Sequence, residues 1–593
     1  EISSMIGGAY IQLGGNLVLR SSNFTNNKAH VGGAVYTSYA NSTIDDCIFD
    51  SNELSGNDST SYGGAIVCDM GNMTLVGSRF INNSAYLGNA VYACDSWYNV
   101  TNCLFENNGN AIFSDFDRNG CSLYANEYNN DSIITNQTFY APTSFAYPGL
   151  NLTLINNTIN VTALPSRFDL RDWGWITPVK YQGLMGACWA FAFGDALETA
   201  LLKATGIRYD ISENYMKNLQ IRYSEFGCSR TDEAGNFFRA LANVLGWLDV
   251  AETEDEYDEV GKLSVFVDSA NKIRLQDAYL IMTDKIDYVD EVKWAILNYG
   301  AVSISYVSSD GEPYFNVDTS AQYANESLPP DHASAVIGWD DNYSVDNFLI
   351  APPANGAWIV KNSWGTEWGD EGYFYLSYYD KSLVSIGGNS SNTNTLVACI
   401  FTNAIDYHAN YQTDLNGFIG FDDDYTQYSN EFSAEYDDLI AGVGTYFNQS
   451  GIDYSFDIYV NGNPVYSQSG ISEFAGYRTI VLDSYVPVKV NDTFKVVFKS
   501  NALPCEAYSR NHYIHGMSFA SADGSTWSDI TLENMTVCLK VYTVADDSKI
   551  ICNNDISVDY DGGKYFTVNV VTADGRAVVG AEVTFKINGR TTT

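Results

Sequence analysis

The chain has 593 residues, of which 45% are apolar, so it is long enough for several domains with separate hydrophobic cores. It carries 72 acidic and 31 basic residues, a net charge of −41. A phosphate backbone needs a basic surface, so this balance excludes nucleic acid as an expected partner and fits a secreted or surface protein. We expect no membrane span, because no apolar run reaches about 18 residues. Both ends look cut, so we expect signal and anchor segments to lie outside this sequence.

A repeat of phenylalanine and asparagine runs through residues 1–163. Four phenylalanines are each followed three residues later by an asparagine, in the pairs Phe24/Asn27, Phe49/Asn52, Phe80/Asn83 and Phe105/Asn108. The phenylalanines are spaced 25 to 31 residues apart. Repeats of this length, with short strands and Gly or Asn turns, are typical of a solenoid. Asparagine tolerates the left-handed backbone, and its amide can bond the asparagine of the next coil. We therefore predict an asparagine ladder, with Cys47 and Cys103 in the inner core.

These repeats resemble the right-handed parallel β-helix of pectate-lyase-like proteins, in the version found in adhesin-like surface proteins of methanogenic archaea. A polysaccharide lyase on this fold would need clustered acidic and basic residues, but Arg20 and Arg79 are the only arginines before residue 100. The segment DFDRNG (115–120) begins like a calcium loop, yet its twelfth position is Asn126 rather than a bidentate glutamate. We expect a solvated turn there, and no metal or cofactor in the chain.

The composition changes at Leu164. From there to residue 202 a Pro- and Trp-containing stretch leads into a run whose apolar residues recur at intervals of three and four, at Trp189, Phe193, Ala196, Leu197 and Ala200. This spacing predicts a helix with Cys188 at or near its N-terminus. Free backbone N–H groups and the helix dipole favour a thiolate, so we expect the pKa of Cys188 to be lowered.

A thiolate nucleophile needs a partner that accepts and returns a proton. The sole histidine between residues 164 and 398 is His332, in DHASAVIGWDD (331–341). Downstream, the strand-like stretch WIVKNSW contains Asn362, whose amide can hold the imidazole in one tautomer while Trp364 shields that bond from water. A single cysteine more often packs in a core. We therefore predict catalysis from the joint presence of Cys188, His332 and Asn362, and not from the cysteine alone.

Residues 164 to about 380 resemble papain, the cathepsins and related cysteine peptidases, through PVKYQG, CWAF, ISENYM, DHA and KNSWGTEWGDEGYF in that order. The resemblance implies that Cys188 is the nucleophile, His332 the general base and acid, and Asn362 the residue that orients His332. It also implies an oxyanion hole completed by Gln182 and substrate-binding positions at Gly235, Trp364 and Ala333. The implied reaction is hydrolysis of a protein or peptide through a thioester on Cys188.

The match has informative departures. Met185 stands where the family usually has a disulfide cysteine, which leaves Cys228 without that partner. Ala234-Gly235-Asn236 replaces the Gly-Gly of the substrate-binding loop, and the insertion NYSVDNFLIAPPANGA (342–357) matches bacterial and archaeal relatives better than papain. The repeats run directly into the peptidase-like stretch where an inhibitory propeptide is usual. Either the active site is permanently open, or the last coil covers it.

The remaining sequence is predicted to be all-β. Alternating runs such as YSFDIYVNG (454–462), YRTIVLDS (477–484) and TFKVVFKS (493–500) indicate a sandwich. It resembles the lectin-like domain that follows such peptidases, and Cys505 and Cys538 are candidates for a disulfide inside it. Residues 546–593 resemble the start of an immunoglobulin-like repeat.

The sequence thus predicts a multidomain protein: a right-handed parallel β-helix (1–163), a papain-like α+β peptidase domain (164–400), a lectin-like β-sandwich (401–545) and a partial immunoglobulin-like domain (546–593). We expect a cysteine endopeptidase on a surface or secreted protein. A glycan or cell-surface ligand is a further expected partner. The competing hypothesis is a surface adhesin whose peptidase domain is secondary or inactive.

Overall fold

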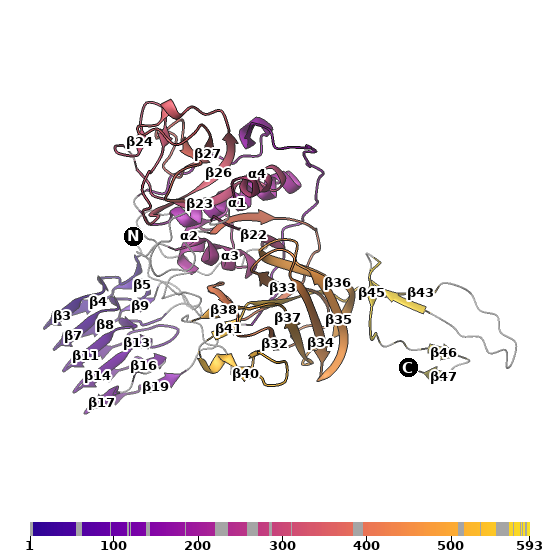
Figure 1. Ribbon diagram of the computed structural model, residues 1–593. Helices are drawn as coiled ribbons and strands as arrows, with labels where there is room; N and C mark the ends of the chain where they lie inside the picture. The colour runs from indigo at the N-terminus through magenta and orange to yellow at the C-terminus, as the bar shows by residue number, and fades with distance from the viewer. Residues whose placement is uncertain are drawn as a thin grey trace.

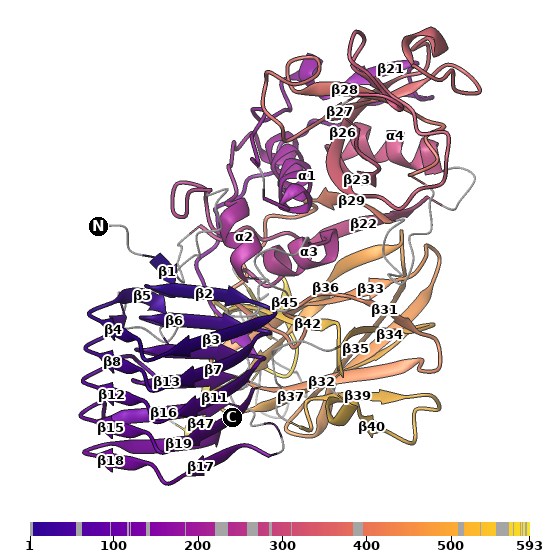
Figure 2. The same ribbon diagram turned by 90° about the vertical axis from the view of Figure 1, so that its left-hand side faces the viewer.

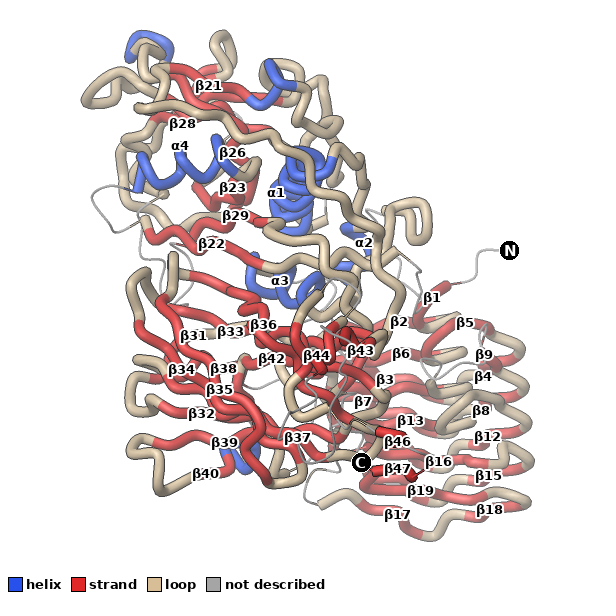
Figure 3. Tube along the Cα trace, turned by 90° about the vertical axis from the view of Figure 1, so that its right-hand side faces the viewer, coloured by secondary structure: helices blue, strands red, loops and turns tan. Residues whose placement is uncertain are grey.

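The computed structural model describes residues 4–54, 62–94, 96–115, 118, 120–137, 143–183, 185–219, 235–257, 271–283, 288–309, 311–383, 395–507, 515–533, 535–552, 568–572, 575–581, 583, 585–587 and 590–592. Figure 1 shows three main parts, which we name the solenoid (4–137), the helical region (164–400) and the two-sheet region (401–545). The solenoid and the two-sheet region lie side by side, with the helical region above both in Figures 2 and 3.

The solenoid is a stack of coils whose strands form parallel sheets (Figure 2). One sheet contains β2 (Tyr10–Leu13), β6 (Val35–Ser38), β10 (Ile66–Asp69), β13 (Val91–Cys94), β16 (Asn110–Asp115) and β19 (Ser132–Gln137). The second contains β3 (Asn16–Arg20), β7 (Asn41–Asp45), β11 (Asn72–Val76), β14 (Trp97–Thr101) and β17 (Ser122–Tyr124). The third contains β4 (Asn23–Thr25), β8 (Ile48–Asp50), β12 (Arg79–Ile81), β15 (Leu104–Glu106) and β18 (Glu127–Asn129). A short fourth sheet has β1 (Ser4–Ile6), β5 (Lys28–Val31) and β9 (Glu53–Leu54).

The asparagine ladder is confirmed. The Asn27 amide donates to Asn52 Oδ1 at 2.8 Å, Asn52 donates to Asn83 at 2.9 Å, and Asn83 donates to Asn108 at 3.0 Å. Asp131 ends the ladder by accepting from Asn108 Nδ2 at 2.9 Å, as suits a carboxylate that only accepts. The ladder residues themselves are not left-handed. That conformation belongs to the residue before each, at Asn26, Ser51, Asn82 and Asn107.

The predicted phenylalanines stack inside the coils. Ring centroids are 4.8 Å apart for Phe24 and Phe49, and 4.9 Å apart for each of the next two pairs along the stack. Cys47 and Cys103 are buried in the same inner cluster, so their core assignment is confirmed. In this region the repeat predicted by the sequence is the repeat of the structure.

A connecting segment (143–163) leads from the solenoid along the other two parts. Its strand β20 (Ser144–Phe145) pairs with β30 (Ala409–Tyr411) of the two-sheet region. Further along, the backbone N–H of Leu150 donates to Lys272 O at 2.9 Å. The N–H of Ile155 donates to Ala204 O at 2.8 Å, at the C-terminal end of α1 (Cys188–Thr205). The segment is therefore attached to the helical region well before the peptidase-like sequence begins.

The helical region places helices against an antiparallel sheet. Its helices are α1, η1 (Leu170–Trp173), α2 (Glu213–Leu219), α3 (Phe237–Leu245), α4 (Tyr288–Asn298) and η2 (Val345–Asn347). Its strands are β21 (Arg167–Asp169), β22 (Asp277–Met282), β23 (Val302–Tyr306), β24 (Phe315–Asn316), β25 (Ala321–Gln322), β26 (His332–Asp340), β27 (Ala357–Lys361), β28 (Tyr373–Ser377) and β29 (Thr395–Ile400).

Two hydrophobic clusters divide the helical region. One contains α1 and α3, and the other contains α4 and the sheet around β26. β26 contributes to both, because Ala333 lies in the first cluster and Ala335 in the second. The start of β26 and the start of α1 are consequently brought to the boundary between the clusters.

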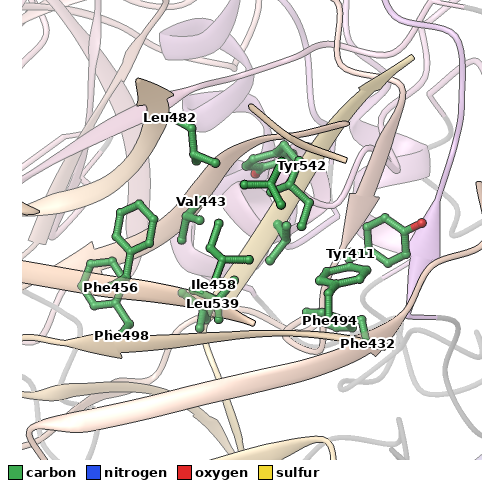
Figure 4. Packing of buried hydrophobic residues seen from close by; sticks show 14 of the residues in the cluster. Tyr411, Phe432, Val443, Phe456, Ile458, Leu482, Phe494, Phe498, Leu539 and Tyr542 are labelled. Carbon is green, nitrogen blue, oxygen red and sulfur yellow. The ribbon is translucent and has the colours of Figure 1, made fainter. Parts of the chain in front are cut away.

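The two-sheet region has one sheet with β30, β33 (Asp438–Phe447), β36 (Gly476–Val488) and β42 (Leu539–Ala545). The other contains β32 (Gln427–Ser433), β34 (Asp453–Val460), β35 (Asn463–Ile471), β37 (Thr493–Lys499), β39 (Ser518–Ser521) and β40 (Ser528–Asp529). A small sheet has β31 (Gly420–Asp422), β38 (Leu503–Ala507) and β41 (Met535–Val537), and η3 (Ile530–Glu533) lies nearby. Val443 and Leu482 of the first sheet share a core with Ile458 and Phe498 of the second (Figure 4). The predicted run 477–484 lies within β36, while the runs 454–462 and 493–500 coincide with β34 and β37 except for their last one or two residues.

The predicted Cys505–Cys538 disulfide is wrong, because both are free buried cysteines. Cys505 pairs across the small sheet with Val537, not with Cys538. Cys538 lies between β41 and β42 and packs in the cluster that contains α1 and α3.

The helical and two-sheet regions are joined by a continuous sheet. β22 pairs with β29 on one side and with β36 on the other. Arg478 of β36 forms an ion pair with the buried Asp277 of β22, with 3.0 Å between Nε and Oδ1. Tyr446 and Tyr477 pack in the same cluster as α1. The two regions therefore share a hydrophobic core.

Beyond β42 the structure describes β43 (Lys549–Cys552), β44 (Val568–Val571), β45 (Ala577–Val578), β46 (Phe585–Ile587) and β47 (Arg590–Thr592). β45 pairs with β36 in parallel. Much of 556–589 lies outside the described residues, so the immunoglobulin-like assignment stays a prediction. In the described part of the chain, no helix has the length and apolar character needed to cross a membrane.

Candidate active site

Cys188 is the first residue of α1, as predicted. Its side chain packs in the cluster that includes Ala333, the residue after His332, and the backbone N–H of Ala333 acts to lower the pKa of the thiol. No side chain caps the N-terminus of α1. The thiol therefore lies at the uncapped N-terminal end of α1, next to the first residues of β26.

His332 and Asn362 are brought together by the pairing of β26 with β27. His332 begins β26, and Asn362 directly follows the last residue of β27. The distance from His332 Nε2 to Asn362 Oδ1 is 2.8 Å. The backbone N–H of Ser363 also donates to Asn362 Oδ1, at 2.8 Å, which orients the amide with its oxygen toward the histidine. An amide oxygen only accepts, so Nε2 carries the proton of the neutral imidazole and Nδ1 keeps its lone pair.

Gln182 is held beside this pair by the residue after Asn362. Its backbone N–H donates to Ser363 O at 2.8 Å, and its Oε1 accepts from Ser363 Oγ at 2.6 Å. Its Nε2 donates one hydrogen to Met185 O at 2.9 Å, across the loop that leads to Cys188. The loop in which Met185 replaces a disulfide cysteine is thus fastened by hydrogen bonds instead. Cys228, the other half of that pair, lies outside the described residues.

The three predicted substrate-binding residues have different surroundings. Trp364 lies over His332, with 4.7 Å between ring centroids. Ala333 is buried beside the thiol. Gly235 packs on the indole of Trp189, and a Cβ built there would be 2.2 Å from a ring carbon, so any side chain would clash. Ala234 lies outside the described residues, and the substrate-binding roles stay predictions.

The expected lowering of the Cys188 pKa is wrong. Burial raises the pKa of the thiol, the Asp331 carboxylate adds to that effect, and the Ala333 N–H opposes it. Burial also lowers the pKa of His332, and the hydrogen bond that His332 donates to Asn362 opposes this effect. The location at the helix start was predicted correctly, but desolvation outweighs it. In the free site both groups are therefore biased toward their neutral forms.

Buried ion pairs fasten the elements that carry the site. Lys361, the residue before Asn362, is fully buried and lies 2.5 Å from Asp195 Oδ1 on α1. Its ammonium also donates to Thr177 Oγ1 at 3.1 Å. The strand that leads to Asn362 is thereby tied to the helix that begins at Cys188. Among the described residues, no group of three or more His, Cys, Asp or Glu is arranged to hold a metal ion.

Sequence reasoning missed Ser334 and Tyr306. Ser334 Oγ donates to Asn362 Oδ1 at 3.2 Å, and its oxygen lies 3.2 Å from the Tyr306 hydroxyl. The Tyr306 ring also stands edge-on to His332, 5.6 Å between centroids. Ser334 lies two residues after His332, and that strand period was an available signal. Tyr306 is opposite His332 only through the β23–β26 register, which the sequence does not reveal.

Comparison with known proteins gives two family matches. Residues 164–393 match the model of the papain family cysteine protease, and residues 410–543 match the model of the lectin like domain. The chain therefore contains a papain-family cysteine protease domain followed by a lectin-like domain.

The curated relatives match the first domain. Oryzain gamma chain of Oryza sativa subsp. japonica is 30% identical over 223 residues, which are 37% of this chain and 56% of the relative. Cysteine proteinase 2 of Zea mays is 31% identical over 220 residues, 36% of this chain and 56% of the relative. The chain thus spans about half the length of these relatives.

A solved structure covers both domains. The cysteine protease and lectin-like domains of Cwp84, a surface layer associated protein of Clostridium difficile, align with a TM-score of 0.54 and 23% identity. The alignment covers 68% of this chain and 93% of that chain. It shows a shared fold for the helical and two-sheet regions. The resemblance of the solenoid to archaeal proteins stays a prediction.

Proposed function

We propose that the helical region is an active cysteine endopeptidase whose nucleophile is Cys188. The observation that carries this proposal is the joint placement of three groups from distant parts of the chain. Cys188 at the start of α1 packs in the same cluster as Ala333, and His332, the residue before Ala333, is hydrogen-bonded to Asn362 at 2.8 Å. An inactive homologue would have no need to bury these three side chains together and to keep the hydrogen bond between His332 and Asn362.

The proposed reaction is acyl transfer. The Cys188 thiol gives its proton to His332 Nδ1, and the sulfur attacks the scissile carbonyl carbon. The second hydrogen of Gln182 Nε2 and the Cys188 backbone N–H stabilise the oxyanion. As the C–N bond breaks, His332 returns the proton to the leaving amine. Water then attacks the thioester, His332 accepts its proton, and Cys188 leaves with that proton as the free thiol.

The test is hydrolysis of a fluorogenic peptide library. Cys188→Ala should lower kcat/KM by at least about 10⁴-fold, as loss of a nucleophile does in other acyl-transfer peptidases. Cys121→Ala removes a partly exposed thiol of the solenoid and is the matched control, which should leave turnover unchanged. No turnover by the intact and trimmed proteins, with normal folding, would favour the adhesin hypothesis.

We also propose that the active site is open in the full chain. The connecting segment contacts the end of α1 opposite Cys188, where Ile155 bonds Ala204 and the Asn157 amide donates to Lys203 O at 2.7 Å. Helix α1 has 18 residues, so this end is about 27 Å from the thiol. A segment that covered the active site would instead have to lie near Gln182 and His332.

Active-site titration with a thiol-directed inhibitor tests this point. Cleavage should be placed near residue 142, which removes the solenoid but keeps the segment that bonds the end of α1. Equal labelling of Cys188 before and after trimming is expected. A large increase after trimming would show that the solenoid covers the site.

We further propose a surface or secreted location, and a ligand-binding role for the two-sheet region, with a glycan or cell-surface ligand as partner. In support, the similar Cwp84 is described as surface layer associated, and this chain has a net charge of −41. We interpret the two layered sheets as a lectin-type sandwich. Such a module would hold the peptidase near its substrate. Surface biotinylation of source cells should label the protein, whereas exclusive recovery in the cytosol would contradict this proposal.

A further inference from the structure

A groove on the outer face of the two-sheet region has the chemistry of a sugar site. Its volume is about 500 Å³, and its walls include Gln427, Glu431, Asp457, Tyr459, Lys495 and Trp527. Small-molecule sites usually measure about 300–1,000 Å³. The groove crosses β34, β37 and β32, which are adjacent in the sheet labelled in Figure 3.

Trp527 is presented by a preorganised loop. The Asp523 carboxylate accepts the backbone N–H groups of Ser525 and Thr526, each at 2.8 Å, and these bonds hold the pKa of Asp523 well below its usual value. The N–H of Gly524 donates to Ser521 Oγ at 2.9 Å. Trp527 directly follows this turn and is itself only partly buried. A flat ring fixed before binding loses little conformational entropy when a ligand stacks on it.

Among the described residues, the charged groups Lys495 and Glu431 of the groove form no ion pair with each other. Lys495 and Glu431 are direct partners across β37 and β32, yet the lysine ammonium lies over the rings of Phe519 and Trp527, at 5.0 and 5.3 Å. Within the described part of the chain, Glu431 has no ion-pair partner. Its carboxylate is thus left to accept hydrogen bonds, and Lys495 keeps donors of its own.

A partly exposed aromatic ring beside carboxylate and ammonium groups that do not pair with each other favours a sugar over a peptide or an anionic ligand. A pyranose ring has an apolar C–H face, which stacks on an aromatic ring, and a rim of hydroxyl groups, which donate to carboxylates. A peptide strand would need a free sheet edge, but β37 is paired on both sides, with β34 and β32. An anionic ligand would meet Glu431, Asp457 and a strongly acidic protein.

We propose that this groove binds a neutral oligosaccharide, with Trp527 as the stacking platform and Glu431 as the acceptor of its hydroxyl groups. The proposal rests on the proposed ligand-binding role of the two-sheet region and is independent of peptidase activity. It specifies the ligand as an uncharged pyranose chain and places it on a sheet face, far along the chain from Cys188.

The test uses the full chain carrying Cys188→Ala, which prevents self-cleavage. Calorimetric titration with cellotriose, mannotriose and N,N′,N″-triacetylchitotriose, up to about 10 mM, should give saturable binding of at least one of them. Trigalacturonate, an acidic trisaccharide, should bind at least about tenfold more weakly. Trp527→Ala should weaken the sugar that binds by at least about tenfold, and Glu431→Ala by several-fold.

Trp173→Ala is the matched control, because this tryptophan of the helical region is 51% exposed and lies outside the groove. It should leave binding unchanged. If both Trp527→Ala and Glu431→Ala bind the sugar with unaltered affinity, the groove is not the binding site, although the region can still bind a glycan elsewhere. Failure of every neutral trisaccharide to saturate, or equal binding of trigalacturonate, would overturn the ligand class. Peptide hydrolysis by the Cys188-containing protein is measured separately, so these failures cannot be confused with loss of the peptidase.

Discussion

The solenoid and the helical region satisfy their buried polar groups in different ways. In the solenoid, neutral amides bond the same amide of the next coil, as Asn52 does to Asn83. In the helical region, isolated charges are buried and paired across long stretches of sequence, as Lys361 is with Asp195. A repeated neutral bond adds a similar small stability at every coil. A buried ion pair is a single costly contact whose loss leaves one charge without compensation.

Breaking the buried ion pair should have the largest effect. Lys361→Met leaves the Asp195 carboxylate buried without its cation and should reduce the free energy of unfolding by about 3–5 kcal/mol. The matched solenoid variant is Lys28→Met, which removes an exposed ion pair with Glu53 and should change stability by less than about 1 kcal/mol. Urea unfolding measures both. Equal effects would contradict the contrast between the regions.

Breaking one rung of the ladder should have a smaller and local effect. Asn83→Ala removes the oxygen that accepts from the Asn52 backbone N–H and from one hydrogen of its amide, and removes the donor to the Phe49 carbonyl oxygen. Each buried group left unsatisfied costs about 1–3 kcal/mol. Hydrogen exchange should rise in the coils around residue 83 and stay unchanged in α1. Faster exchange throughout the protein would show that the solenoid is not a stack of nearest-neighbour units.

The two-sheet region also buries an ionisable group, Glu506 of β38, so its stability should depend on pH, whereas the amides of the solenoid ladder do not ionise. Burial raises the pKa of Glu506 to about 8 from 4.5. Between these values the folded protein holds a proton that the unfolded chain releases, so stability falls as pH rises from 4.5 to 8, by up to about 1.4 kcal/mol per unit. Glu506→Gln should flatten this dependence in urea unfolding at pH 5 and 8. The destabilisation caused by Asn83→Ala should be the same at both pH values.

The smallest effect is expected at Ser334, whose hydroxyl bonds Asn362 Oδ1. One such bond contributes about 1 kcal/mol, so Ser334→Ala should lower kcat about three- to tenfold with little change in KM. Ser334→Thr keeps the hydroxyl and should restore activity. Ser305→Ala, on the neighbouring strand, is the control. A loss of stability without a change in kcat would limit Ser334 to a structural role.

The sequence was sufficient for the features that repeat or occur as local motifs. The phenylalanine and asparagine pairs predicted the solenoid ladder, because each coil repeats the same contacts. The helix beginning at Cys188 followed from apolar spacing, and the strands of the two-sheet region followed from alternation. The composition of the site followed from the family motifs, which place Gln182, Cys188, His332 and Asn362 in order.

Tertiary structure decided the rest. The burial that raises the pKa of Cys188, the Tyr306–Ser334 contact, the free state of Cys505 and Cys538, and the groove beside Trp527 all depend on strand pairing between distant segments. A one-residue change of register would turn the strand residues Tyr306, Ser334 and Cys505 to the opposite face. Desolvation is likewise a property of the assembled core and not of any residue. The sequence by itself therefore determined which chemical groups are present, and only packing decided their contacts and charge states.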